Sequence, residues 1–149
     1  MKKSKYFLLI ISLFFNFISP IPVAEASVSL TASSAILLEP STDRIIYSRA
    51  PHRRQSPAST AKIVTALVVL DTLPLDRWVR ISSRVHDIEP SKLYLRGGEQ
   101  ILVRDLLKAV LMKSANDAAA ALAIEISGSE SQFAQLMTEK SRSLGAQNT

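Results

Sequence analysis

The sequence predicts a mixed fold of the α/β (α+β) class, in which an N-terminal β-hairpin precedes a mainly helical part. Two short apolar runs, 35–38 and 45–47, flank the turn-rich segment EPSTDR, a pattern typical of a hairpin. Helical periodicity of apolar residues appears at 57–73 and returns at 104–145. A chain of 149 residues that is 47% hydrophobic is long enough to build one domain with a core.

The first 26 residues have the layout of a secretory signal peptide. Three lysines precede the apolar run 6–18, and the small-residue pattern Ala24-Glu25-Ala26 follows it. We expect cleavage after Ala26, which leaves residues 27–149 as the exported part, in the periplasm or at the extracytoplasmic cell surface. An uncleaved anchor is the alternative, but the apolar run is short for a bilayer span.

Composition excludes several function classes. Loss of residues 1–26, with three lysines and one glutamate, lowers the formal charge from +5 to +3, and no basic run is interleaved with aromatic residues. Nucleic acid is therefore not an expected partner. The chain has no cysteine, which excludes thiol catalysis and cysteine-based metal sites. His52 and His86 lie far apart in polar contexts and are expected at the surface.

The middle of the chain predicts a helix followed by irregular chain with short strands. The helix at 57–73 is expected to stop at Pro74, because proline cannot continue it. Strands are expected at 78–81 and 93–95, with a turn at Gly97-Gly98 after them.

Three further helices are expected after this segment. The first begins at Arg104, with Lys108 on its outer side. The second spans 117–126, with Gly128 as its C-terminal cap. The third opens with a capping box and ends near Gly145. The capping box consists of Ser129 and Gln132. The apolar side chains expected on the inner faces of the first and third of these helices are Leu106, Leu107, Val110, Leu111, Phe133, Leu136 and Met137.

One lysine, Lys62, lies in an otherwise apolar helical stretch, three residues after Ser59. At 100° per residue the two side chains fall on one side of the helix, one turn apart. Ser59 lies in the first turn, where free N–H groups favour a developing negative charge. Burial can convert a lysine ammonium into a base, so Ser59 is a candidate nucleophile and Lys62 its base. The alternative is a lysine that reaches solvent beside a serine at a helix start.

A second candidate group is Ser114-Ala115-Asn116, at the junction of two helices. A tight connection there can present Ser114 and Asn116 to a shared cleft. A hydroxyl can relay a proton, and a carboxamide can both donate to and accept from an amide substrate. Helix capping is the alternative interpretation, and we expect Asp117 to stabilise the next helix as a cap.

The order S-x-x-K, then S-x-N some fifty residues later, resembles the serine penicillin-recognising enzymes. Three segments narrow the resemblance, namely SPASTAKIVTALVVLD, GGEQILVRDLLKAVLMKSANDAAAALA and FAQLMTEKSRSLGAQNT. They are similar to the D-alanyl-D-alanine carboxypeptidases, the low-molecular-mass penicillin-binding proteins. The resemblance covers residues 34–149 and implies a β-lactamase/transpeptidase-like fold.

The resemblance also implies roles for four residues. Ser59 would be the nucleophile that attacks the penultimate D-alanine of a peptidoglycan stem peptide ending in D-Ala-D-Ala, and Lys62 would be its general base. Ser114 would relay a proton to the leaving amine, and Asn116 would bind the substrate amide. The reaction needs no cofactor or metal, β-lactams are implied inhibitors, and the function is cell-wall biogenesis and cell shape.

The sequence departs from the family pattern in three places. Asp43 stands where the family usually has a glycine in the hairpin turn, a tolerable change because aspartate enters left-handed conformations readily. Thr138 replaces a common asparagine. The third family motif, K-T-G, does not occur in the 149 residues. We therefore expect residues 27–149 to form the N-terminal part of a catalytic domain, without its C-terminal sheet strands and inactive alone. Membrane association is expected only through a segment after Thr149.

Two alternatives to the carboxypeptidase remain. One is a non-catalytic remnant or a muropeptide-binding fragment that keeps only part of the cleft. The other is a serine β-lactamase, which shares S-x-x-K. Ala115 disfavours the β-lactamase, because its commoner second motif is S-D-N.

Overall fold

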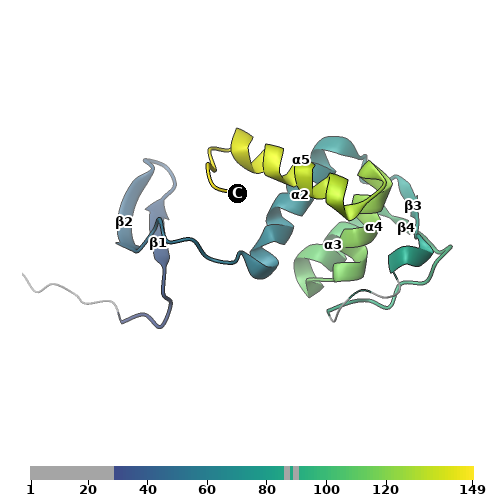
Figure 1. The fold of residues 1–149 in the computed structure, drawn as a ribbon, viewed down its shortest axis with the longest axis horizontal. Coiled ribbons are helices and arrows are strands. Elements are labelled where there is room, and N and C mark those ends of the chain that lie inside the picture. Colours follow the sequence, from purple (N-terminus) through teal and green to yellow (C-terminus); the bar gives the residue numbers. More distant parts are fainter. Residues whose placement is uncertain (1–28, 86–87, 89–90) are drawn as a thin grey trace, which may run out of the picture. The chain divides into compact units, whose positions relative to one another are not determined.

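The computed structural model describes residues 29–85, 88 and 91–149. The chain divides into two compact units, a hairpin unit up to Arg54 and a helical unit from Gln55 onward, and Figure 1 labels their elements. The predicted signal peptide and His86 lie outside the described residues. No helix in the described part of the chain is long and apolar enough to cross a bilayer.

The hairpin unit contains β1 (Ala35–Glu39) and β2 (Arg44–Arg49), which pair antiparallel as predicted. Its turn contains Asp43 with a φ of 53°, a left-handed conformation that aspartate tolerates better than most residues. The expectation that aspartate can replace glycine in this turn is therefore confirmed. The apolar side chains of the strands remain about half exposed; they are Ile36, Leu37, Leu38, Ile45 and Ile46.

The carboxylate of Glu39 organises this turn. It accepts hydrogen bonds from the hydroxyls of Thr42 and Ser41, and from the Ser41 backbone N–H at 3.1 Å. These bonds, the one from the Thr42 side chain first, lower the pKa of Glu39 from 4.5 to about 2.

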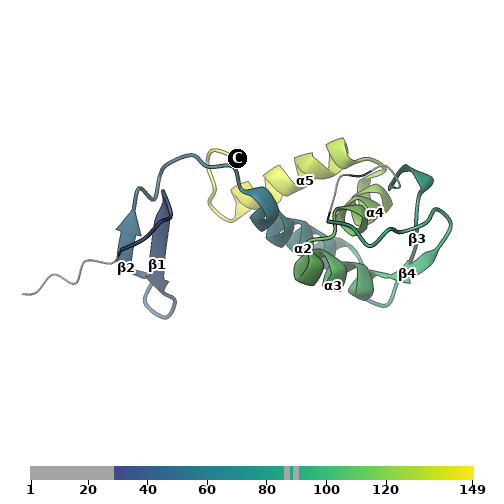
Figure 2. The same cartoon turned by 90° about the horizontal axis from the view of Figure 1, so that it is seen from below.

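The helical unit has eight elements in its described part. In chain order they are η1 (Ala58–Thr60), α2 (Ala61–Thr72), β3 (Trp78–Arg80), η2 (Ser83–Val85), β4 (Gln100–Leu102), α3 (Val103–Lys113), α4 (Asn116–Ser127) and α5 (Glu130–Ser143). Strands β3 and β4 pair antiparallel, with Trp78 opposite Leu102. Helix α4 contacts α2, α3 and α5 as well as β3 and η2, so it is the central helix of the unit (Figures 1 and 2).

The core of the helical unit is formed where these helices meet. The predicted inner-face residues Leu106, Leu107, Val110 and Phe133 are buried, and Leu136 and Met137 are partly buried. The expectation for Leu111 is wrong, because its side chain is 57% exposed. Helix α3 ends two residues later, and the neighbouring Met112 is also exposed, so the last turn contributes little to the core.

The strand predicted at 93–95 is also wrong. The backbone N–H groups of Leu93 and Leu95 donate to the carboxylate of Asp117 instead of a neighbouring strand. Tyr94, between them, has a φ of 60°, which lies outside the β region. Strand β3 pairs instead with β4, which begins after the predicted turn at Gly97-Gly98. In that turn a Cβ on Gly97 would lie 2.9 Å from the Cα of Ser83, so a larger residue does not fit.

The predicted helix boundaries are largely confirmed. Leu73 is extended before Pro74 and ends α2, Gly128 ends α4 with a φ of 78°, and Ser129 Oγ accepts from the Gln132 N–H at the start of α5. Asp117 is not the N-cap residue of α4, but it lies in the first turn and its carboxylate accepts from the Ala118 N–H at 2.9 Å. The expected support of the helix start is therefore found without the expected cap position. Helix α4 begins at Asn116 with Ala115 as its N-cap residue, and the carboxylate of Asp117 reaches across to another segment.

Candidate active site

The four site residues predicted from the sequence come together in the helical unit. Ser59 lies in η1 just before α2, Lys62 lies in the first turn of α2, Ser114 ends α3 and Asn116 begins α4. The Ser114 hydroxyl donates to Ser59 Oγ at 2.9 Å, and Lys62 Nζ donates to Asn116 Oδ1 at 2.7 Å. Two segments more than fifty residues apart therefore form one polar cluster.

Ser59 occupies the short η1 turn that leads into α2. The sequence placed it in the first turn of an α-helix, but the α-helix itself begins at Ala61. The preceding residue, Ala58, has a φ of 44° and Ser59 is exposed. The serine hydroxyl is therefore accessible to a substrate while it stays hydrogen-bonded to Ser114.

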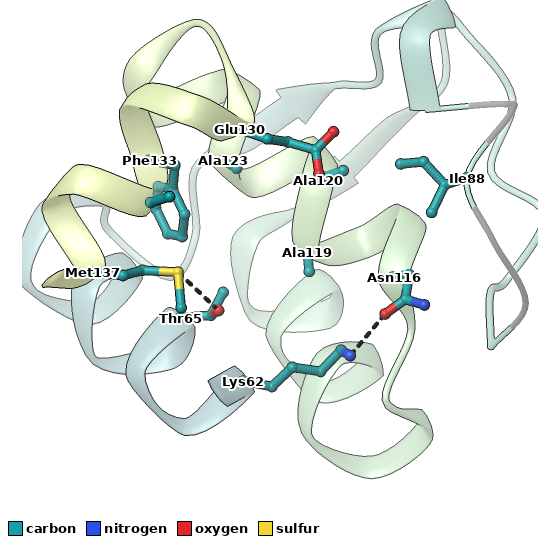
Figure 3. A pocket seen from close by; sticks show the side chains of 11 residues that line it. Lys62, Thr65, Ile88, Asn116, Ala119, Ala120, Ala123, Glu130, Phe133 and Met137 are labelled. Carbon is teal, nitrogen blue, oxygen red and sulfur yellow. Dashed lines mark hydrogen bonds between the residues drawn. The ribbon is translucent and has the colours of Figure 1, made fainter. Parts of the chain in front are cut away.

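Lys62 is half-buried in the first turn of α2, and its long side chain points toward α4 (Figure 3). Its described hydrogen bond goes to Asn116 and not to Ser59. The hydrogen bond from Lys62 Nζ to the amide oxygen of Asn116 holds the lysine side chain in place.

The turn between α3 and α4 orients Ser114 and Asn116. Ser114 ends α3 in a left-handed conformation with a φ of 55°, and the Ala115 N–H donates to the Ala109 carbonyl at 3.2 Å. Asn116 then begins α4. A single left-handed residue thus directs a hydroxyl toward Ser59 and a carboxamide toward Lys62.

Left-handed backbone is concentrated around this cluster. Of six non-glycine residues with positive φ in the described part of the chain, four lie in the segments that meet here: Ala58, Ser91, Tyr94 and Ser114. Such conformations cost about 1–3 kcal/mol each and persist where the surrounding structure holds them, often at functional sites.

Lys62 and Asn116 face a cleft of about 630 Å³ between α2, α4 and α5 (Figure 3). Its other lining residues include small side chains of α4 and larger apolar side chains of α5; among them are Ala119, Ala120, Ala123, Phe133 and Met137. The sequence did not indicate this cleft, because alanines carry no chemical signal and their partners lie on another helix. In the described residues no three histidine, aspartate or glutamate side chains gather as a metal site would require.

The sequence also gave no sign that residues 91–95 belong to the site. The Asn116 N–H donates to the Ser91 carbonyl at 2.7 Å, and Asp117 binds the backbone of Leu93 and Leu95. These partners are more than twenty residues apart in the chain, so no local pattern identifies them.

Comparison with known proteins relates this arrangement to one family. Residues 21–149 match the sequence profile described as D-alanyl-D-alanine carboxypeptidase, Peptidase S11. The D-alanyl-D-alanine carboxypeptidase DacF of Bacillus subtilis is 36% identical over 123 residues, which cover 79% of this chain and 32% of that protein. A D-alanyl-D-alanine endopeptidase of Pseudomonas aeruginosa is 38% identical over 122 residues, which cover 80% and 39%.

Solved structures share the fold. Penicillin-binding protein 5 from Haemophilus influenzae superposes with a TM-score of 0.76 at 30% identity, over 83% of this chain and 38% of that one. The carboxypeptidase DacD from Francisella tularensis gives a TM-score of 0.79 at 29% identity, over 88% and 33%. The predicted β-lactamase/transpeptidase-like fold is thereby confirmed.

The chain spans about a third to two fifths of the length of these relatives. The profile match nevertheless extends over most of the chain, from residue 21 to residue 149, and includes both serines of the polar cluster. The chain therefore belongs to the D-alanyl-D-alanine carboxypeptidase family.

Proposed function

We propose that the full-length protein is a serine D-alanyl-D-alanine carboxypeptidase that removes the terminal D-alanine from peptidoglycan stem peptides. The observation that carries this proposal is the polar cluster in which Ser59 bonds to Ser114 and Lys62 bonds to Asn116. In this proposal Ser59 is the nucleophile, Lys62 the base, Ser114 the proton relay and Asn116 the amide-binding group, and the chemistry of these groups requires no metal.

Acylation begins when the Ser59 hydroxyl attacks the carbonyl carbon of the penultimate D-alanine. Its proton passes to Lys62, the peptide C–N bond breaks, and the leaving amine of the terminal D-alanine receives a proton through Ser114. The products are an ester on Ser59 and free D-alanine. Water then attacks the ester, which restores the Ser59 hydroxyl and releases the shortened peptide.

Lys62 can serve this step from its described position. The Lys62 nitrogen can make more than one hydrogen bond, so its bond to Asn116 leaves it able to interact with a second group. The flexible four-carbon stem lets the amine turn toward Ser59 when substrate is bound. Asn116 is held by its backbone and by Lys62, and these contacts support its proposed role in binding the substrate amide.

The proposed substrate also implies where the protein would act. Stem peptides lie outside the cytoplasm, which agrees with the signal peptide expected at residues 1–26 and with cleavage after Ala26. The protein would act in cell-wall biogenesis and cell shape, and β-lactams would inhibit it by acylating Ser59.

A second candidate activity is D,D-endopeptidase action on cross-linked peptides. The observation that favours it is the 38% identity to a protein named as an endopeptidase. The acyl-enzyme on Ser59 is common to both activities, and they differ only in whether the leaving amine belongs to free D-alanine or to a second peptide.

The test is the release of D-alanine by the full-length protein from a synthetic peptide ending in D-Ala-D-Ala. We expect release that is lost in Ser59→Ala and kept in Ser131→Ala, a matched change at an exposed serine of α5. Cleavage of cross-linked peptide alone would indicate the endopeptidase, and penicillin hydrolysis alone a β-lactamase. A protein that neither cleaves peptide nor binds penicillin would be a non-catalytic remnant, and the proposal would be wrong.

A further inference from the structure

Asp117 is a buried acidic residue next to the proposed substrate-binding asparagine, and its side chain is only 1% exposed. Its Oδ1 accepts from the N–H groups of Leu93 at 3.1 Å and Ala118 at 2.9 Å. Its Oδ2 accepts from those of Leu93 at 2.9 Å and Leu95 at 3.1 Å. Burying a carboxylate is costly unless hydrogen bonds compensate for lost water, and here three backbone donors do so.

These bonds attach residues 91–95 to the first turn of α4. The same segment is held at a second point, since the Ser91 carbonyl accepts from the Asn116 N–H at 2.7 Å. The first N–H groups of a helix have no partner inside it, so this bond also satisfies the start of α4. Asn116 and Asp117, adjacent in sequence, thus hold one segment from both ends.

The backbone of residues 91–95 contains unfavourable left-handed conformations. Ser91 and Tyr94 have φ values of 69° and 60°, and the Tyr94 side chain is 78% exposed. Lys92 Nζ donates to the Ile88 carbonyl and lies 5.5 Å from the centre of the Tyr94 ring. Two left-handed residues within four positions persist only where other contacts fix the backbone.

We propose that Asp117 is a positioning residue of the active site. By fixing residues 91–95, it fixes the carbonyl that holds the Asn116 backbone, and it thereby sets where the Asn116 carboxamide lies relative to Lys62. Asp117 itself touches neither Lys62 nor Ser59 among the described contacts. The expected effect of Asp117 on acylation rests on the proposed function. Its effect on the backbone of residues 91–95 does not.

The first test needs no activity and uses the variant Asp117→Asn in the full-length protein. One carboxylate oxygen becomes an NH₂ group, so either the Ala118 or the Leu95 N–H faces a donor instead of an acceptor. Leu93 donates to both oxygens and is affected in either orientation. We therefore expect hydrogen exchange at Leu93, at whichever of Ala118 and Leu95 faces the NH₂ group, and at Asn116 to accelerate at least about tenfold, the effect of one lost charge-assisted bond. Amides in the middle of α4 should keep their protection.

Asp105→Asn is the matched control, because Asp105 lies in the first turn of α3 but is solvent-exposed. It should change none of these exchange rates. If Asp117→Asn does not fold, hydrogen exchange in the unsubstituted protein still tests the proposal. The amides of Leu93, Leu95 and Asn116 should then exchange with the same opening free energy, because one local opening exposes all three. Exchange at unstructured-peptide rates at Leu93 and Leu95, or an unchanged Asn116 amide in Asp117→Asn, would overturn the proposal.

The second test asks whether Asp117 acts through Asn116. We expect Asp117→Asn to slow penicillin acylation at least about tenfold, and the double variant with Asn116→Ala to be no slower than Asn116→Ala alone. Fully additive effects would overturn the positioning role. If Asn116→Ala itself acylates normally, the proposed function of Asn116 fails, and the exchange experiment still judges the role of Asp117.

Discussion

The Ser114 hydroxyl donates a 2.9 Å hydrogen bond to the Ser59 hydroxyl, although 55 positions separate the two residues in the sequence. The contact depends on η1, which leads into α2, and on the end of α3, and both contain left-handed backbone, at Ala58 and at Ser114 itself. The fold therefore maintains strained geometry at both ends of this bond, and it keeps the proposed proton relay, Ser114, next to the proposed nucleophile.

Substitution of Ser114 should separate its backbone role from its chemical role. Ser114→Gly removes the hydroxyl at a position with a φ of 55°, which glycine adopts without strain. We expect it to unfold at the same or a higher temperature than Ser114→Ala, while both variants lose about a hundredfold or more in D-alanine release. Thermal unfolding and peptide assays on both variants check this. A near-native rate in Ser114→Gly would exclude the proton relay.

Lys62→Arg should abolish efficient acylation although it retains the positive charge. A guanidinium does not deprotonate usefully near neutral pH, so it cannot accept the Ser59 proton. We expect penicillin acylation to fall by at least about a hundredfold, measured as the rate of adduct formation. Lys108→Arg, at an exposed lysine that pairs with Asp105, is the matched control and should acylate normally. Normal acylation in Lys62→Arg would place the base elsewhere.

Tyr94 offers a test of backbone strain beside the site. Its φ of 60° is unfavourable for any residue with a Cβ, and its side chain is largely exposed. Tyr94→Gly should therefore be more stable than Tyr94→Ala by about 1 kcal/mol in denaturant unfolding. Equal stabilities would mean that the backbone at this position relaxes when the ring is removed.

The hairpin turn should respond to acid through Glu39. Its pKa is lowered from 4.5 to about 2 in the folded chain, mainly by the Thr42 hydroxyl. The stabilising effect is therefore present above pH 4.5 and is lost as the pH falls through about 2. An NMR titration of the Glu39 carboxyl carbon should show the low midpoint, and Thr42→Ala should raise it. A midpoint near 4.5 in the unsubstituted protein would contradict these turn contacts.

The parts of the fold that the sequence predicted correctly depend on short-range patterns. Pro74 ends α2, Gly128 ends α4 and Ser129 caps α5 through contacts within a few residues. The grouping of Ser59 with Lys62 follows from helical spacing. Their convergence with Ser114 and Asn116 was implied by family resemblance, because spacing alone does not determine which helices meet.

The errors arose where a distant residue decides the local structure. Residues 93–95 have the composition of a strand, but Asp117, 22 residues from Leu95, takes the N–H groups that a strand would use. Asp117 also lies beyond the N-cap residue Ala115, so it supports the helix start through the Ala118 N–H and not as its cap. Leu111 follows the apolar pattern of α3, yet it lies in the last turn of the helix and remains exposed.

The central claim, that Ser59 is the acylated nucleophile, is tested most directly by locating the penicillin adduct. The full-length protein is incubated with a labelled penicillin, digested and mapped by mass spectrometry. The label should lie on the peptide that contains Ser59, disappear in Ser59→Ala and remain in Ser131→Ala. A label on Ser114, or one that persists in Ser59→Ala, would contradict the assignment.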